Sequence, residues 1–491
     1  MRSMVLAVSL VCSWGVLSSC QVDEEFARRA WLQNTLIEDN RDFLDRDPLA
    51  TAAKWEKMAS DLYFYFRGTS SVFVADLQNP AHGGGWATEF GTAAAAQVAT
   101  LADPHPENLG TFRWADGTMS VEYNDFDGAL YGPYYFGVRR LATGFGVLAR
   151  RSAELDSDDE AGLAEAVAQG YVDEILALSA NEAPTVLRAG QDNGVIIDDL
   201  LRRARRDGDA HQNFTRYTRV VDGRRQMILG DLEPPRGAVL TRRMEPLSDE
   251  EKRLLTSLLE EYPDTLVDAE SLGAQRLYFL DGARRFGAGV SSYPGLRYYL
   301  LVADDPDAVN APVEELLLLE FKELRDPTGV GGLELWPPRP FKHNAERLVT
   351  LRRAFHEVPD TDPWLGWAAE GSVGFRVRHL TRYQRNISVD RITEKIADRD
   401  WEAADLTRLA YEAGRILARG HARSPTSSGE AGLDAIHAAV HDDPESFVEE
   451  TRAFTVEYID RYVADYGLFI ELLEQHGPLL GYRPRSHRSL R

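Results

Sequence analysis

Hydrophobic positions along the chain recur with two different periods, one typical of helices and the other of strands. The helical period predicts helices at 21–60, 133–210, 245–268, 345–355, 401–420 and 444–475. Short apolar and aromatic runs, bounded by Gly or by Asp-Asp-Pro, predict strands at 276–280, 297–302, 316–321 and 375–380. A strand-rich block therefore lies between two helix-rich blocks, and this order favours an α+β fold.

Two further short strands are expected at 98–101 and 119–123, around a turn at Asp116-Gly117. Each is followed by a short segment rich in polar residues: Asp103 to Asn108 after the first strand, and Asn124 to Asp127 after the second. Carboxylates and an amide at adjacent strand ends suit one divalent cation with bound phosphate. The alternative is that these Asp and Asn residues only cap turns and helices.

Composition narrows the classes of protein that remain. Of the 491 residues, 44% are hydrophobic and 27% are charged, which excludes a disordered or collagen-like chain. The formal net charge of −23 disfavours nucleic acid as a partner, because the chain would repel the phosphate backbone. Length alone allows up to three domains, but a single large two-lobed domain fits equally well.

The N-terminal residues have the pattern of a signal peptide. Arg2 precedes a largely apolar stretch from Met4 to Leu17, which is too short for a membrane span. The stretch ends Leu17-Ser18-Ser19-Cys20, which resembles the bacterial lipobox and implies cleavage before Cys20 and lipidation of its thiol. Ordinary secretion and an uncleaved segment are the alternatives. Since Gln21 follows Cys20, the lipid-anchored reading favours the outer membrane of the cell envelope.

Five segments resemble, in order, the motifs of the uncharacterised bacterial family DUF2252. Residues 101–110 (LADPHPENLG) and 123–127 (YNDFD) resemble its GDAHxxNFG and NDFD signature. The other three resemble its FxFLRG, KEA and AHARS elements, at 64–68, 321–323 and 420–424. The resemblance spans about residues 50–430.

The first two segments are also similar to the catalytic loop and metal-binding strand of aminoglycoside-phosphotransferase and protein-kinase-like proteins. That resemblance implies that Asp103 is the catalytic base and Asn108 a metal ligand. It makes Asp125 the principal metal ligand, with Asp127 assisting. The Asp would accept a proton from the attacking hydroxyl or orient it, while the metal bridges phosphate oxygens.

A kinase-like protein also needs a glycine-rich hairpin and a strand lysine, and here both lie downstream of the catalytic loop. Gly287, Gly289 and Gly295 precede the strand expected at 297–302, and Lys322 follows the next strand. Glu346, on the following helix, is expected to pair with Lys322. The implied architecture is a kinase-like two-lobed α+β fold in circularly permuted order, with a small antiparallel sheet and a larger helical lobe.

The lipobox-like segment and the family motifs together divide the chain into a signal peptide, 1–19, and a single domain, 20–491. Within the domain, about 50–245 holds the catalytic loop and helices, about 270–390 the sheet, and about 395–480 the C-terminal helices. Mg²⁺ or Mn²⁺ with ATP or another nucleotide would be the cofactors. The main functional hypothesis is a lipid-anchored, metal-dependent phosphotransferase acting on a small molecule.

The chain departs from these patterns at several positions. Ala102 replaces a Gly, Ser291 and Pro294 interrupt the glycine loop, and Gly128 stands where an acidic residue is usual. ATP is also scarce outside the cytoplasm. Two alternatives therefore stay open: a catalytically silent protein that binds a ligand or an envelope partner, and a metal-dependent phosphohydrolase.

Overall fold

The computed structural model describes most of the chain. It describes residues 8–78, 88–114, 116–232, 242–274, 276–325, 341–356 and 362–484, with side chains from residue 24 onward except at positions 213, 232 and 242. Residues 83–85, which are three consecutive glycines, residues 327–340, which the Pro and Gly content predicts as a loop, and the side chain of Cys20 lie outside this description. No helix among the described residues is long and apolar enough to cross a membrane.

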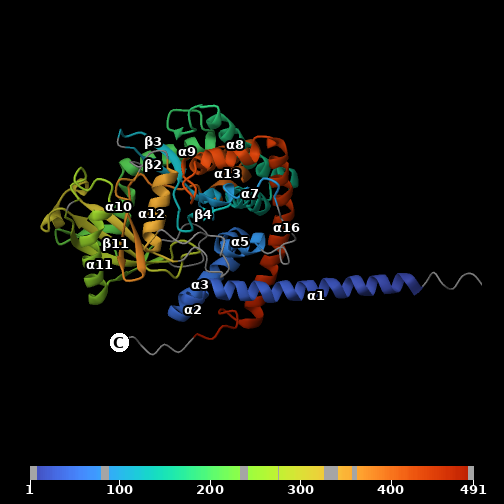
Figure 1. The fold of residues 1–491 in the computed structure, drawn as a ribbon. Coiled ribbons are helices and arrows are strands. Elements are labelled where there is room, and N and C mark those ends of the chain that lie inside the picture. The colour runs from blue at the N-terminus through green and yellow to red at the C-terminus, as the bar shows by residue number, and fades with distance from the viewer. Residues whose placement is uncertain are drawn as a thin grey trace, which may run out of the picture.

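Helices make up most of the described chain. They are α1 Val8–Asp39, α2 Arg41–Arg46, α3 Pro48–Ala59, α4 Leu62–Gly68, α5 Ser70–Gln78, α7 Tyr134–Arg151, α8 Ser157–Ser179, α9 Val195–Asp209, α10 Gln212–Tyr217, α11 Asp249–Glu261, α12 Asn344–Phe355, α13 Val389–Ala397, α14 Ala403–Arg423, α15 Gly432–Val440 and α16 Pro444–His476. Figure 1 shows α1 and α16 crossing beside the bundle that contains α7, α8 and α14.

The strands form four antiparallel groups. The largest is a seven-stranded sheet with the order β13-β14-β12-β11-β10-β9-β8. Its strands are β8 Gly230–Leu232, β9 Arg242–Pro246, β10 Tyr278–Phe286, β11 Arg297–Ala303, β12 Leu317–Leu324, β13 Gly366–Glu370 and β14 Val373–His379. The smaller groups contain β1 Val98–Thr100, β2 Leu109–Arg113, β3 Met119–Tyr123, β4 Leu130–Gly132, β5 Leu187–Arg188, β6 Thr218–Val221 and β7 Arg224–Met227.

Both faces of the large sheet are buried. Alternate residues of β11 point to opposite sides, so Tyr298 and Leu300 pack with α11, while Tyr299 and Leu301 pack with Phe214 of α10. The first turn of α11 is fixed by a capping box between Ser248 and Glu251, as its acidic start predicts. Helix α12 packs against both the sheet and α14, and so joins the sheet to the helical part of the molecule (Figure 1).

Helices α8 and α14 approach each other closely because a glycine stands on each at the crossing. A Cβ built on Gly170 of α8 would lie 2.1 Å from the carbonyl oxygen of Tyr411, and one on Gly414 of α14 would lie 2.2 Å from that of Val167. Backbone carbonyls cannot swing aside as a flexible side chain can. The crossing therefore depends on the missing side chains.

We expect Gly414→Ala to lower the free energy of unfolding by about 1–3 kcal/mol, the usual cost of overpacking a core. Gly162→Ala is the matched control on α8, because nothing lies within 4 Å of a Cβ there. It should be neutral or stabilise by up to ~1 kcal/mol, because alanine favours a helix more than glycine does. Urea unfolding of both variants measures the difference, and equal effects would contradict the account.

The structure corrects the hairpin expected around Asp116-Gly117. The strands at 98–101 and 119–123 both exist, but β1 pairs with β4 and β3 pairs with β2. The hydrophobic pattern does not predict β2, which starts directly after Asn108, nor the strands β4 to β9 and β13. It also ended the third strand of the sheet block too early, because β12 continues through Lys322 to Leu324.

The confirmed description is a mixed α+β protein with antiparallel sheets and a larger helical part. The expected helices at 345–355, 401–420 and 444–475 correspond closely to α12, α14 and α16. The helix expected at 245–268 is shorter and ends at Glu261.

Candidate functional site

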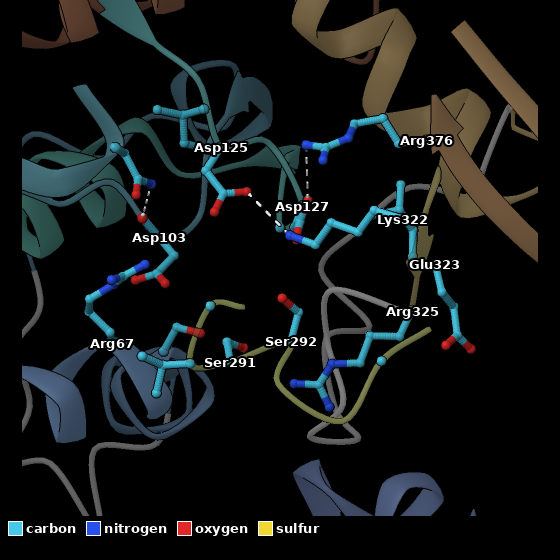
Figure 2. A pocket seen from close by; sticks show the side chains of 18 of the residues that line it. Arg67, Asp103, Asp125, Asp127, Ser291, Ser292, Lys322, Glu323, Arg325 and Arg376 are labelled. Atoms are coloured by element: carbon cyan, nitrogen blue, oxygen red, sulfur yellow. Dashed lines mark hydrogen bonds and ion pairs between the residues drawn. The ribbon is translucent and has the colours of Figure 1, made fainter. Parts of the chain in front are cut away.

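A polar pocket of about 250 Å³ lies where the large sheet faces the loops around β2 and β3. Figure 2 shows Asp103 and Arg67 on one side of it and Lys322 and Arg376 on the other, with Ser291 and Ser292 below. The pocket thus brings together the loop after β1, the loop after β3, the loop between β10 and β11, and the inner face of β12 and β14. These segments are far apart in sequence, from Asp103 after β1 to Arg378 on β14.

The loop after β1 holds Asp103 in a strained but well-bonded conformation. Ala102 has a φ of 62°, in the left-handed region that favours glycine, which costs a residue with a Cβ roughly 1–2 kcal/mol. The side-chain nitrogen of Asn108 donates to the carbonyl oxygen of Asp103 at 2.9 Å. That bond closes the loop. It uses only the amide nitrogen of Asn108, so the amide oxygen stays available to bind a cation.

Asp103 has a partner that the sequence analysis did not identify. Its Oδ1 accepts a hydrogen bond from Nε of Arg140, on α7, at 2.8 Å. The guanidinium of Arg140 is fully buried and lies 3.5 Å from the ring centre of Phe66. Burial raises the pKa of Asp103, while Arg140 and Arg67 oppose that rise.

Asp125 and Asp127 both face Lys322, although β12 lies about 200 residues further along the chain. The Nζ of Lys322 is 4.0 Å from Oδ1 of Asp125 and forms a closer ion pair with Oδ2 of Asp127 (Figure 2). Burial opposes the charge of Asp125, but Lys322 and Arg376 hold its pKa far below the usual range. Burial likewise lowers the pKa of Lys322, and the two aspartates counteract that shift.

Each of the two aspartates also has one buried oxygen without a hydrogen bond. Within the described part of the chain, Oδ1 of Asp125 and Oδ1 of Asp127 have no hydrogen-bond partner; their neighbouring cations are at longer range, Lys322 at 4.0 Å from the first and Arg376 at 3.9 Å from the second. A buried, unbonded carboxylate oxygen is costly unless a cation or donor satisfies it. The donor set therefore fits a hard divalent cation bound by carboxylate and amide oxygens.

The described residues do not form a cation site from protein ligands alone. No group of three or more His, Cys, Asp or Glu side chains among them has the geometry of a metal site. Two carboxylates with Asn108 match the usual environment of Mg²⁺, which takes one or two carboxylates and completes its shell with waters and substrate phosphates. The pocket therefore fits a cation that binds together with a phosphate compound.

The loop between β10 and β11 closes the lower side of the pocket. Gly289 and Gly295 line it together with Ser291 and Ser292, whereas Gly287 does not. Gly289 has a φ of 81° and its carbonyl oxygen accepts a hydrogen bond from Lys57 at 2.7 Å. Two of the three expected loop glycines therefore lie at the pocket.

The expected partnership between Glu346 and Lys322 is not found. An oxygen of the Glu346 carboxylate accepts from the backbone N–H of Lys342 at 2.7 Å, at the start of α12. Glu346 is not among the residues that line the pocket. The reason is that Asp125 and Asp127 already neutralise Lys322, so a third carboxylate would gain little there.

His105 and His421 lie within the motif segments 101–110 and 420–424, and both are buried. Burial and the neighbouring Arg67 lower the pKa of His105, and burial lowers that of His421 to about 3. The Nδ1 of His421 bonds to the hydroxyl of Tyr171 at 2.8 Å. These contacts give His421 a structural role at the end of α14.

Sequence analysis missed most of the basic residues of the pocket. Six cationic side chains line it: Arg67, Arg297, Lys322, Arg325, Arg376 and Arg378. Only Lys322 was assigned a role from the sequence. The period-2 alternation of β11, β12 and β14 would have placed Arg297, Arg376 and Arg378 on the same face as Lys322, if the strand pairing had been known.

Fold and pocket together define an α+β protein with a cationic, carboxylate-containing site between a sheet and a helical region. The chain matches the model of the family described as "Uncharacterized protein conserved in bacteria (DUF2252)" over residues 46–472. The chain therefore belongs to the DUF2252 family. No curated protein and no solved structure matches it.

Proposed function

We propose that the pocket binds a divalent cation together with a phosphate compound, and that the protein is a metal-dependent phosphotransferase acting on a small molecule. The main support is that Asp125 and Asp127 each keep one buried oxygen without a hydrogen bond, in a pocket that basic side chains also line. Mg²⁺ or Mn²⁺ fits these donors. In this proposal the fold is a permuted form of the kinase-like arrangement, with the catalytic loop preceding the sheet.

The residues divide among three tasks. Asn108, Asp125 and Asp127 would hold the cation, which neutralises charge on the phosphate oxygens when bound. Lys322, Gly289 and Gly295 would hold the phosphate chain. Asp103 would accept the proton of the acceptor hydroxyl while the oxygen of that hydroxyl bonds to the terminal phosphorus. The electron pair of the broken P–O bond leaves with the departing phosphate.

One observation favours a silent binding protein as the second candidate. The Asp103 carboxylate is already bonded to the buried guanidinium of Arg140. Such a bond stabilises the charged carboxylate, so it opposes the rise in the pKa of Asp103 that burial causes, and it occupies an oxygen that could take up the proton. A protein of this kind would bind the phosphate compound or an envelope partner without transferring a phosphate group.

Binding and turnover measured on the same protein separate the candidates. Phosphotransfer predicts that Mg²⁺ or Mn²⁺ and a phosphate compound raise the melting temperature together more than either does alone, and that phosphate passes to an added acceptor. Binding without transfer under all acceptors tested would favour the silent protein. Phosphate release without an acceptor would favour a hydrolase. Absence of any binding would exclude all three.

We also propose that the protein is anchored to the cell envelope through a lipid on Cys20, on the basis of the apolar segment and the lipobox-like Leu17-Ser18-Ser19-Cys20. Mass spectrometry of protein extracted from bacterial membranes should find a diacylglyceryl group on an N-terminal Cys20. A mature N-terminus at another residue would contradict the anchor. It would leave the phosphate proposal unaffected, because the two rest on different parts of the chain.

A further inference from the structure

The pocket face of the large sheet is organised in three successive rows across β11, β12 and β14. The strand pairing aligns Arg297, Lys322 and Arg376 in the first row, which borders the cation-binding aspartates. The second row is Tyr299, Glu320 and Arg378. In the third, Leu301 and Leu318 are fully buried. The rows thus pass from cationic to apolar with increasing distance from the cation site.

Glu320 closes the pocket behind the first row. Its carboxylate is buried and forms ion pairs with Arg297, at 3.2 Å, with Arg376, and with Arg378, at 3.0 Å. Burial opposes the charge of Glu320, yet the three arginines hold its pKa far below the usual range. One carboxylate thus fixes three guanidiniums, which leaves these arginines with net positive charge directed at the pocket.

Beyond Glu320 the sheet face is already covered by protein. Tyr217 of α10 packs edge-on against Tyr299, with ring centres 4.9 Å apart. Leu301 and Leu318 pack against Phe214 of α10 and Met227 of β7. Among the residues that the structure describes, no open apolar slot therefore continues past Glu320 to Leu301 and Leu318 on this face.

A purine or pyrimidine base needs such a slot, because aromatic or apolar side chains must stack against its faces. Apolar side chains at the pocket are few and scattered: Phe43, Leu101, Val290 and Leu324. The pocket volume of about 250 Å³ also lies below the roughly 300–1,000 Å³ that is common for small-molecule sites. Size and lining both indicate a compact, strongly anionic ligand.

We propose that the ligand of this pocket is a compact phosphoanhydride, a chain of two or three phosphates of the inorganic triphosphate type, and that the pocket has no site for a nucleoside base. This inference rests on the proposed phosphate-binding function and replaces ATP as its donor. The first-row cations and the bound divalent cation would neutralise the phosphate chain. A phosphate donor that carries no nucleoside base is also compatible with an envelope location, where ATP is scarce.

A second cavity offers the competing outcome. It has a volume of about 410 Å³, is lined by Trp114, Trp364 and Tyr383, and shares Arg378 and Gln384 with the pocket. A nucleotide with its phosphates in the pocket would have to pass Arg378 and Gln384, the two side chains common to both cavities, to place its base there. Arg378 is held in place by its ion pair with Glu320, at 3.0 Å.

Calorimetric titration of the full chain with inorganic triphosphate, ATP and adenosine, each with Mg²⁺, tests the inference. We expect triphosphate to bind at least as tightly as ATP, and adenosine neither to bind nor to compete. A base held by stacking would instead strengthen ATP on the order of 10-fold or more over triphosphate, and this result would overturn the inference while leaving phosphate binding intact. If neither phosphate compound binds, the proposed function itself fails.

Substitution of one first-row arginine shows whether the calorimetric signal comes from this pocket. Arg297→Gln should weaken triphosphate and ATP by the same factor, on the order of 10-fold, because it removes one charged donor that both would use. Arg284→Gln is the matched control, because Arg284 lies near Glu251 of α11, on the opposite side of the sheet. Equal effects of the two variants would place the binding elsewhere and overturn the assignment.

Discussion

Asp125→Asn should abolish the metal-dependent part of phosphate binding and leave the metal-independent part no weaker than in the parent. The carboxylate of Asp125 has a buried oxygen without a hydrogen bond and lies 4.0 Å from Lys322. An amide keeps the shape but loses the negative charge that a hard cation needs. We expect a loss of at least ~100-fold with Mg²⁺, since even outer-shell partners of metal ligands cost about 10–100-fold.

The opposite behaviour without metal is what makes this variant informative. Removing Asp125 leaves Lys322 and Arg376 with one carboxylate fewer to neutralise them, so the pocket becomes more attractive to a phosphate anion. Asp304→Asn is the charge-matched control, because Asp304 is exposed and outside the pocket. Titrations with triphosphate, with and without Mg²⁺, measure the metal-dependent and the metal-independent affinity of each variant. Equal losses in the presence and absence of Mg²⁺ would show that Asp125 is not a metal ligand.

The local parts of the fold could be predicted from the sequence because their signals are local. Ser248 and the acidic residues after it place the start of α11 correctly, since a capping box acts within one turn. The long apolar period of 444–475 corresponds to α16. Pairing between strands was predicted less well, because it depends on residues far apart in sequence. The β1–β4 and β2–β3 pairs replaced the expected hairpin for this reason.

In the candidate site, too, the local features could be predicted from the sequence, whereas the contacts between distant segments could not. The polar groups at 103–108 and 124–127 could be recognised from the sequence, since each follows a short strand. Lys322 was matched to them only through the kinase-like order of motifs, and the structure places it beside Asp125 and Asp127. Glu346 was assigned by the same analogy and lies outside the pocket. An analogy transfers the order of elements better than it transfers a particular ion pair.

Arg140 could not have been predicted as the partner of Asp103. It lies in the middle of α7, among apolar residues, where an arginine is usually read as a side chain that extends to solvent. The structure instead buries it completely against Phe66. Burying a guanidinium is costly unless it is paired, so Asp103 contributes to stability as well as to the pocket. Any test of a catalytic role must separate these two contributions.

Asp103→Asn provides that test, and we expect it to lower phosphotransfer by on the order of 10²-fold or more. The amide cannot accept the proton of an acceptor hydroxyl, whereas its oxygen can still accept the hydrogen bond from Arg140. Binding of Mg²⁺ and triphosphate should therefore stay within roughly threefold of the parent, less than 1 kcal/mol. Single-turnover transfer and calorimetric binding, measured on the same preparation, separate the two effects.

Glu107→Gln is the matched control for this prediction. Glu107 lies in the same loop and pairs with Arg67 at 2.6 Å, but it does not line the pocket. Both substitutions remove one negative charge that faces an arginine, fully buried for Arg140 and partly buried for Arg67, so both should lower the melting temperature. Only Asp103→Asn should also remove turnover. If both variants lose transfer in proportion to stability, Asp103 is a structural partner of Arg140, and the silent binding protein becomes the better account of the pocket.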